Sequence, residues 1–439
     1  MIYQWLVLLA LATLIALIAW GRIERHWISL AILLMLLITG TVLPQELLDF
    51  VDWDVLGLIL GMSILTIYLE ESGLMDIVAK RLERYLNSPK KLIFWLSFIA
   101  GIVSIFLENV TVVLLLAPIV FRLSKSLKIS PVLSLIPVAL ASNMAGSATM
   151  VGDPPAIITA GYLNLVFTDF IWYNGKPSMF FMTLVPMVLA CALITFIASR
   201  SIRYNQGIDI PNNSTDTQEA RDTYIDRVFV LEALGFLTLK IVLLSVRHAL
   251  HLSLSMIALI AVSGLTITRA LHRDFVSIKK AIIQGFEWKL ILFLIGVFTL
   301  SGAFAKHGLA EIVAHKIISL GYGNIFIITS LLILISVLIS AFIDNVPYIT
   351  TMLPVISVIA NTLNIEPITI AWAVLLGTTL GGNLTYIGAS ANVTAIRLLE
   401  KNSYRVTFLD FIKLSLPFNT ISVVSGWIMY EVIWILPYS

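Results

Sequence analysis

Three carboxylic acids lie inside long apolar stretches of this sequence. Glu108 stands in IFLENVTVV, Asp153 in TMVGDPPAII and Asp344 in SAFIDNVPY. At the centre of a membrane helix each would cost about 2.5 to 3.5 kcal/mol if it stayed charged and unpaired, so such acids are usually functional. We predict that they carry protons or bind a cation, alternating between neutral and charged forms. The other interpretation is that each acid is only the N-terminal cap of a helix.

Polar oxygens and glycines accompany the three acids. Amide, hydroxyl and backbone oxygens suit a partly dehydrated ion, and glycines let two backbones approach closely. The other interpretation is that these groups only satisfy one another and an interrupted backbone. The predicted ion- or substrate-binding residues are Glu108, Asn109, Thr111, Asn143, Ser147, Thr149, Gly152, Asp153, Asp344, Asn345, Gly382, Asn383, Thr385, Ser390 and Asn392, with Glu108, Asp153 and Asp344 as the proton-coupling acids.

The composition is that of a membrane protein. Of the 439 residues, 59% are hydrophobic and only 12% are charged, about half the charged fraction of a soluble domain. A soluble enzyme, a secreted scaffold and a nucleic-acid-binding protein are therefore excluded. The single cysteine, Cys191, excludes disulfides and multi-thiolate metal sites. Apolar runs that could cross a bilayer lie at 2–20, 27–43, 55–69, 178–198, 228–246, 252–268, 290–305 and 414–436.

Two further regions, 92–165 and 325–400, are cut by polar clusters and are copies of each other. Trp53 matches Trp288 at an offset of 235, and Asn109 matches Asn345 at an offset of 236. Matches kept in register over about 100 residues indicate a duplication. We predict an N-terminal membrane half at 1–198 with a repeat core at 53–198, a cytoplasmic linker at 199–227, and a C-terminal half at 228–439 with a repeat core at 288–436.

Basic residues predict the orientation, because short cytoplasmic loops are enriched in Lys and Arg. Arg22 and Arg25 mark one such loop, and the loops at 80–91 and 122–128 are also basic. The segment 92–121 therefore enters and leaves on one side, as a re-entrant helical hairpin tipped by Glu108-Asn109. The second copy is inverted, with a hairpin tipped by Asp344-Asn345 that enters from outside.

The expected fold is an all-α polytopic membrane protein with two inverted repeats, each containing a re-entrant hairpin and a broken transmembrane helix. Both termini are expected to be extracytoplasmic. Broken backbone is tolerated at membrane depth only where it is buried in protein or lines a cavity, so the four breaks predict one central site. Amphipathic helices are expected at 74–85 in the cytoplasmic interface and at 309–320 in the outer one.

Four segments resemble the ion transporter superfamily: FLENVTVVLLLAPIVFRLSKSL, SNMAGSATMVGDPPAIITAG, AFIDNVPYITTMLPVI and LGGNLTYIGASANVTA. Within it the chain is most similar to the branch of the arsenite pump ArsB, the NhaD sodium/proton antiporter, the pink-eyed dilution P protein and citrate transporter-like permeases. The resemblance implies a scaffold, a transport unit with both hairpins, elevator-like alternating access and often a homodimer. It also implies Na+ at the hairpin tips, where an acid replaces the Ser of relatives that bind carboxylates.

The charges at the breaks limit which substrates the site could bind. The four breaks contain no Lys, Arg or His, so a di- or tricarboxylate would meet like charge without a fixed positive partner. The leading hypothesis is a secondary active transporter of a small inorganic ion or oxyanion, with arsenite- or antimonite-type efflux favoured, coupled to a proton or sodium gradient. The alternatives are a Na+/H+ antiporter, an anion or dicarboxylate/citrate permease, and an ion channel.

No enzyme activity is expected, because the chain has no HExxH or GxSxG motif and no His near the three acids. It also has no P-loop, so a gradient or a separate ATPase subunit must supply the energy. The expected partners are the lipid bilayer, the transported ion and a second copy of the chain. No cofactor is expected besides H+ or Na+ as coupling ion, and the expected location is the plasma membrane, as a bacterial inner-membrane protein. Glu232 and Lys240, within the run 228–246, receive no role.

Overall fold

The computed structural model describes residues 2–74, 77–78, 81, 85–204 and 226–438, nearly all of them helical. The first half contains α1 (Ile2–Trp20), α2 (Arg25–Ile38), α3 (Pro44–Phe50), α4 (Trp53–Glu71), α6 (Pro89–Ser104), α7 (Asn109–Ser126), α8 (Val132–Gly146), α9 (Pro154–Tyr162), the 3-10 helix η1 (Phe167–Phe170), the antiparallel strands β1 (Trp172–Tyr173) and β2 (Lys176–Pro177), and α10 (Met179–Tyr204).

The second half repeats this order. It contains α11 (Arg227–Ser245), α12 (Leu254–Leu271), α13 (Phe275–Gly285), α14 (Trp288–Lys306), α15 (Leu309–Leu320), α16 (Ile325–Ser340), α17 (Asn345–Leu363), α18 (Pro367–Gly381), α19 (Ser390–Lys401) and α20 (Phe408–Tyr430), then the π-helix η2 (Glu431–Ile435) and the 3-10 helix η3 (Leu436–Tyr438).

Each of the eight predicted apolar runs forms a helix, and the ends differ most in α2, α10 and α20, the last of which begins at Phe408 instead of the predicted 414. α2 ends at Ile38, earlier than predicted, because the chain turns at Gly40, whose φ of +68° favours glycine. α10 continues to Tyr204, past the predicted boundary at 198. In the described part of the chain, eight helical segments are long and apolar enough to cross a membrane, or nine if the bent pair α15–α16 counts as one span.

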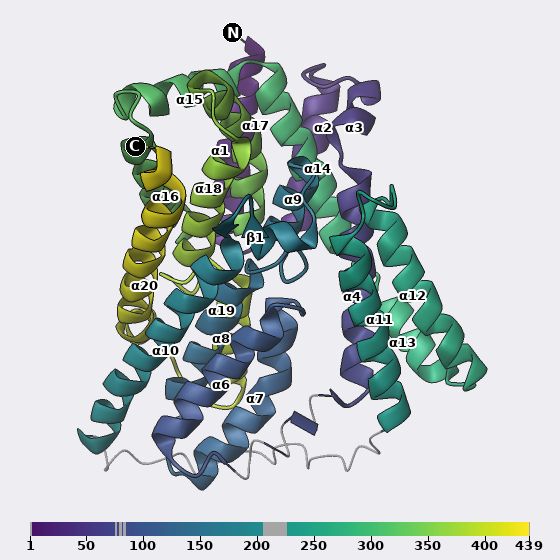
Figure 1. Cartoon of the computed structure of the whole chain (residues 1–439), viewed down its shortest axis with the longest axis vertical. Helices are drawn as coiled ribbons and strands as arrows, with labels where there is room; N and C mark the ends of the chain where they lie inside the picture. The colour runs from purple at the N-terminus through teal and green to yellow at the C-terminus, as the bar shows by residue number, and fades with distance from the viewer. Residues whose placement is uncertain (1, 75–76, 79–80, 82–84, 205–225, 439) are drawn as a thin grey trace.

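The two repeats run in opposite directions (Figure 1). The α6–α7 hairpin enters from the lower end of the view, whereas the α16–α17 hairpin enters from the upper end, where both termini also lie. Residues 147–153 interrupt the helix between α8 and α9, and residues 382–389 interrupt it between α18 and α19. The predicted fold class, two inverted repeats that each contain a re-entrant hairpin and a broken helix, is therefore confirmed.

Helix packing separates two groups. The scaffold group comprises α1–α4 and α11–α14, and the hairpin group comprises α6–α10 and α16–α20. Within the scaffold group, an added Cβ at Gly57 or Gly61 would lie 2.5 Å from a side chain of α12, so these glycines let α4 and α12 approach closely. The two groups meet where α4 contacts α9 and where α14 contacts α17.

The predicted amphipathic segment 309–320 is the helix α15. It buries Leu309, Ala314 and Ile317, exposes Lys316, and joins α16 through a bend of 118°. In Figure 1 it lies across the upper end of the molecule. Its predicted counterpart at 74–85 lies largely outside the described residues, as does the predicted linker from 205 to 225.

Candidate functional site

The tip of the first hairpin is fastened to the broken helix beside it. Ser104 Oγ, at the end of α6, donates to Asn109 Oδ1 over 2.5 Å, and Thr149 Oγ1 donates to the Ile105 carbonyl oxygen over 2.7 Å. A Cβ at Gly146 would lie 2.4 Å from Asn109 Oδ1, so only glycine allows this approach. Asn109 and Thr149 therefore fix the geometry of the tip.

The second hairpin repeats these contacts with the equivalent residues. Ser340 donates to Asn345 Oδ1, and Thr385 donates to the Ala341 carbonyl oxygen. A Cβ at Gly382 would lie 3.1 Å from Asn345 Oδ1. The duplication therefore preserves the hydrogen bonds that build the tip as well as the helices.

The two breaks meet through a symmetric pair of hydrogen bonds. Asn143 Nδ2 donates to Asn383 Oδ1 over 3.0 Å, and Thr379 Oγ1 lies 2.8 Å from Ser147 Oγ. Since Asn143 is equivalent to Thr379 and Ser147 to Asn383 in the repeat register, these are one contact made twice. Ser147 Oγ also donates to Asp153 Oδ2 over 2.8 Å. Four of the predicted residues, Asn143, Ser147, Asp153 and Asn383, thus form one buried network together with Thr379.

An unsatisfied oxygen lies beside the second tip. Asn392 is fully buried, and its Nδ2 donates to the Gly382 carbonyl oxygen over 3.1 Å. Among the described residues, Asn392 Oδ1 has no hydrogen-bond partner. The carbonyl oxygens of Ser340, Gly382 and Ala341 would lie 2.6, 2.8 and 3.0 Å from a Cβ at Gly388. Such a concentration of oxygens fits a bound cation.

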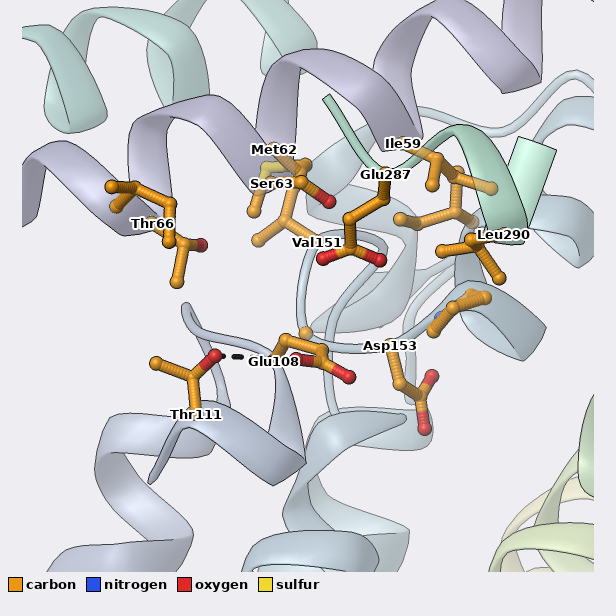
Figure 2. Close-up of a pocket in the computed structure, with 14 residues that line it drawn as sticks. Ile59, Met62, Ser63, Thr66, Glu108, Thr111, Val151, Asp153, Glu287 and Leu290 are labelled. Carbon is orange, nitrogen blue, oxygen red and sulfur yellow. Dashed lines mark hydrogen bonds between the residues drawn. The ribbon is translucent and has the colours of Figure 1, made fainter. Parts of the chain in front are cut away.

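Three carboxylates line a small cavity between α4 and the first hairpin tip (Figure 2). Its volume is about 40 Å³, which is room for a water molecule or a small ion. Glu108 and Asp153 reach it from the hairpin group, and Glu287, directly before α14, reaches it from the scaffold group. The cavity is also lined by Ile59, Met62, Ser63, Thr66, Ile67, Thr111, Val151, Gly152, Pro154, Ile157 and Leu290.

The hydrogen bonds of these acids test the capping interpretation. Asp153 Oδ1 accepts the Ala156 N–H over 3.2 Å, so this acid caps α9 and also faces the cavity. Glu108 stands at the cap position of α7 but makes no capping hydrogen bond, and instead accepts from Thr111 Oγ1 over 3.2 Å.

In the described chain no group of three or more His, Cys, Asp or Glu is arranged to hold a metal ion.

Asp344, the third predicted acid, is paired with a base. Its Oδ2 lies 3.0 Å from Nη1 of Arg25 at the start of α2, and its Oδ1 caps α17 by accepting the Val346 N–H. Arg25 also stands over the ring of Phe293, 5.2 Å from its centroid. The expectation that no fixed positive group stands at a break was therefore wrong. Arg25, interpreted from sequence as a loop marker, lies 319 positions away along the chain.

A second, larger cavity lies where α14 and α17 meet α9 and the end of α3. Its volume is about 440 Å³, and its charged members are Asp49, Asp52 and Lys306. Lys306 is paired with Glu46 at 2.7 Å. Both cavities therefore lie between the scaffold group and the hairpin group.

Some residues of this site were missed and one prediction lies apart from it. Ser390 is exposed at the start of α19, and no contact joins it to the central network in the described chain. Glu287, Arg25 and Thr379 belong to the site but were not predicted. For Glu287 a signal existed, because it precedes Trp288 as Asp52 precedes Trp53 in the matched repeats.

Two opposed hairpins, two broken helices and a buried polar junction define a polytopic membrane transporter. The family model of the citrate transporter matches residues 15–377 and 264–436. This chain therefore belongs to the citrate transporter family, and the family resemblance of its motifs is confirmed.

The individual relatives agree with this assignment. An uncharacterized transporter of Mycobacterium tuberculosis is 29% identical over 428 residues, which cover 95% of this chain and 96% of that protein. The P protein of Mus musculus is 29% identical over 454 residues, covering 87% of this chain and 54% of that protein. The YdaH transporter of Alcanivorax borkumensis has a similar fold, with a TM-score of 0.59 and 16% identity over 88% of this chain and 86% of that chain. The chain is a multi-pass membrane transporter and not an enzyme.

Proposed function

We propose that this transporter is a secondary active carrier of a small inorganic ion, and that exchange of a cation for protons is the activity its site supports best. The observation that carries the proposal is the cavity shared by Glu108, Asp153 and Glu287, which joins the two helix groups. A carboxylate binds a cation when ionised and releases it when protonated, so one group of acids can couple the two ions. H+ and Na+ are the proposed coupling ions.

The hairpin tips are the proposed Na+ sites. The buried, unpartnered Oδ1 of Asn392 and the carbonyl oxygens around Gly388 support a site at the second tip. At the first tip, a Cβ at Gly152 would lie 2.2 Å from the Gly146 carbonyl oxygen and 2.6 Å from that of Ser104. The equivalent oxygens are thus gathered in both repeats.

Two other substrates have weaker support. Arsenite- or antimonite-type efflux fits the neutral amides of Asn109, Asn143 and Asn383, which can hydrogen-bond a neutral hydroxide. A dicarboxylate or citrate requires positive charge, and Arg25, the base found at a tip, is already paired with Asp344. The acids of the cavity would repel such a substrate.

The proposed mechanism moves the hairpin group against the scaffold group, as in an elevator. α17 packs on α14 beside the larger cavity, whereas α4 meets the hairpin group through α9 and faces the first tip across the small cavity, so the two interfaces differ in this conformation. We also propose a homodimer in a bacterial inner membrane with both termini outside. The proposed energy source is a proton or sodium gradient, and a separate ATPase subunit is the alternative.

Reconstitution of the purified chain in liposomes tests the proposal. Uptake of radioactive Na+, arsenite and citrate is measured with and without an imposed pH gradient, in the absence of ATP. We expect saturable Na+ flux that requires the gradient, is lost in Asp153→Asn and persists in Glu400→Gln, an exposed acid of α19. No gradient-dependent flux of any solute would refute a carrier, and single-channel current steps would establish a channel instead. Citrate or arsenite flux without Na+ flux would replace the proposed substrate.

A further inference from the structure

Lys240, in the middle of α11, is a buried amine without a charged partner. Its side chain is 0% exposed, and its Nζ donates to the Met62 sulfur of α4. A thioether is only a weak acceptor. Among the described residues, no carboxylate lies within ion-pair distance of Lys240. A buried ammonium without an anion costs several kcal/mol, which this single weak hydrogen bond cannot offset.

The charged groups on the elements packed against α11 have other partners, except Glu70 of α4, whose side chain is exposed. At one end of α11, Glu232 binds Arg269 of α12 and lies 2.9 Å from His272. At the other end, Asp54 of α4 accepts the N–H groups of Leu254 and Ser255 and so caps α12. The remaining ionisable side chains on α4 and on η1 are Tyr68, which hydrogen-bonds Thr266, Glu70, Glu71, which pairs with Lys280, and Asp169, which caps η1.

Met62 separates this amine from the acidic cavity. The side chain of Met62 lines the cavity together with its neighbour Ser63, while Lys240 contacts the same sulfur from α11. In Figure 2 Met62 and Ser63 stand on the α4 wall beside Glu287, opposite Glu108. Methionine is unbranched and has three rotatable bonds, so it can change rotamer at low cost. One flexible side chain therefore stands between a buried amine and three carboxylates.

We propose that Lys240 is a movable counter-ion of this cavity. In the present conformation the amine is uncharged behind Met62. When Met62 moves aside, the amine takes one proton from water in the cavity, and the resulting ammonium pairs with the Glu287 carboxylate. A carboxylate paired with the ammonium releases its bound cation, so one cation leaves for each proton taken up. On return the ammonium gives its proton back to water and the amine withdraws behind Met62.

This inference rests on the proposed cation exchange and names the residue that carries the proton on the scaffold side. It predicts different results for two substitutions of Lys240. Lys240→Met fills the space without any charge, and Lys240→Arg is charged at all times because a guanidinium does not lose its proton in proteins. The exposed Lys279→Met on α13 is the matched control.

The test is Na+ flux in liposomes, measured as Na+/Na+ exchange and as proton-driven uptake over a range of pH. We expect Lys240→Met to retain Na+/Na+ exchange and to lose about tenfold of the proton-driven uptake, with a pH dependence that is weaker than that of wild type because only the acids of the cavity still titrate. We expect Lys240→Arg to lose both, since its charge stays in the cavity and excludes Na+. Lys279→Met should behave as wild type.

Three results would overturn the inference. These are a wild-type pH profile in Lys240→Met, loss of Na+/Na+ exchange in Lys240→Met, which would make the lysine a requirement for binding, and full activity in Lys240→Arg. The outcome is separable from that of the proposed function. If wild-type protein shows no proton-driven Na+ flux, cation exchange fails; if wild type and Lys240→Met are equally coupled, only the role of Lys240 fails.

Discussion

The ion pair between Arg25 and Asp344 should hold the protein in its present conformation. Arg25 belongs to the scaffold group and Asp344 to the hairpin group, and their side chains are 40% and 18% exposed. An exposed pair contributes about 1 kcal/mol or less, whereas removing one partner of a buried pair costs about 3 to 5 kcal/mol. For this half-buried pair we take about 2 kcal/mol, which corresponds to a change of about 30-fold in an equilibrium constant.

The substitutions Arg25→Gln and Asp344→Asn remove the ion pair, and Arg25→Gln also removes the cation–π contact with Phe293, which lies within the scaffold group. Asparagine retains an oxygen that can accept the Val346 N–H and so preserves the cap of α17. If the pair exists only in this arrangement of the two groups, each variant shifts the population by about 30-fold toward the alternative. The matched control is Lys289→Gln, which breaks the 2.6 Å bridge to Glu24 within the scaffold group and should not shift it.

Distances between spin labels measure the shift. Cysteines placed at Ile38, which is 84% exposed at the end of α2, and at Leu338, which is 62% exposed on α16, report on the two groups. The native Cys191 is buried and should not react. We expect a second distance to gain population in Arg25→Gln and in Asp344→Asn, but not in Lys289→Gln.

The double variant provides the decisive comparison. Because both substitutions break the same pair, Arg25→Gln with Asp344→Asn should shift the distribution no more than either alone. Unchanged distances in both single variants would refute the role of this pair, and so would fully additive shifts.

Three further predictions concern the central site. Glu108→Gln should weaken the proton dependence of transport, since glutamine can still accept from Thr111 but cannot take up a proton, and a wild-type pH profile would contradict this. Gly152→Ala should lower the melting temperature and stop transport, because its Cβ would lie 2.2 Å from a carbonyl oxygen at a cost of about 1 to 3 kcal/mol; Gly235→Ala, with nothing within 4 Å, should be neutral or slightly stabilising in the same melting experiment. Asn392→Ala should raise the half-saturating Na+ concentration by about tenfold while leaving the proton dependence intact, and an unchanged Na+ affinity would exclude it as a ligand.

The elements of this fold could be predicted from sequence because their signals are local. Asp153 followed by Pro154 marks a helix start, and the structure begins α9 there with the expected cap. The hairpin tips were found because an acid and an asparagine interrupt otherwise apolar runs in both copies. The repeat register then predicted which residues of the two halves would occupy equivalent positions.

The contacts between helices that are far apart along the chain could not be predicted in this way. The pairing of Arg25 with Asp344 joins segments 319 positions apart, and neither residue carries a pattern that points to the other. The approach of Lys240 to Met62 depends on how α11 packs on α4, which hydrophobic periodicity does not specify. Glu287 has a signal in the sequence, since the repeat register places it at the position of Asp52, but the two residues differ in type.

The unequal packing of the two hairpins has a consequence for the conformation not observed here. The second hairpin contacts its scaffold helix through α17 and α14, beside the larger cavity, while α4 contacts α9 and faces the first tip across the small cavity. Because the copies are inverted, giving each copy the arrangement of the other produces a molecule open toward the opposite face. α7 would then close on α4, and α17 would withdraw from α14. Each repeat therefore shows, in the present structure, the arrangement that the other repeat would adopt in the opposite-facing conformation.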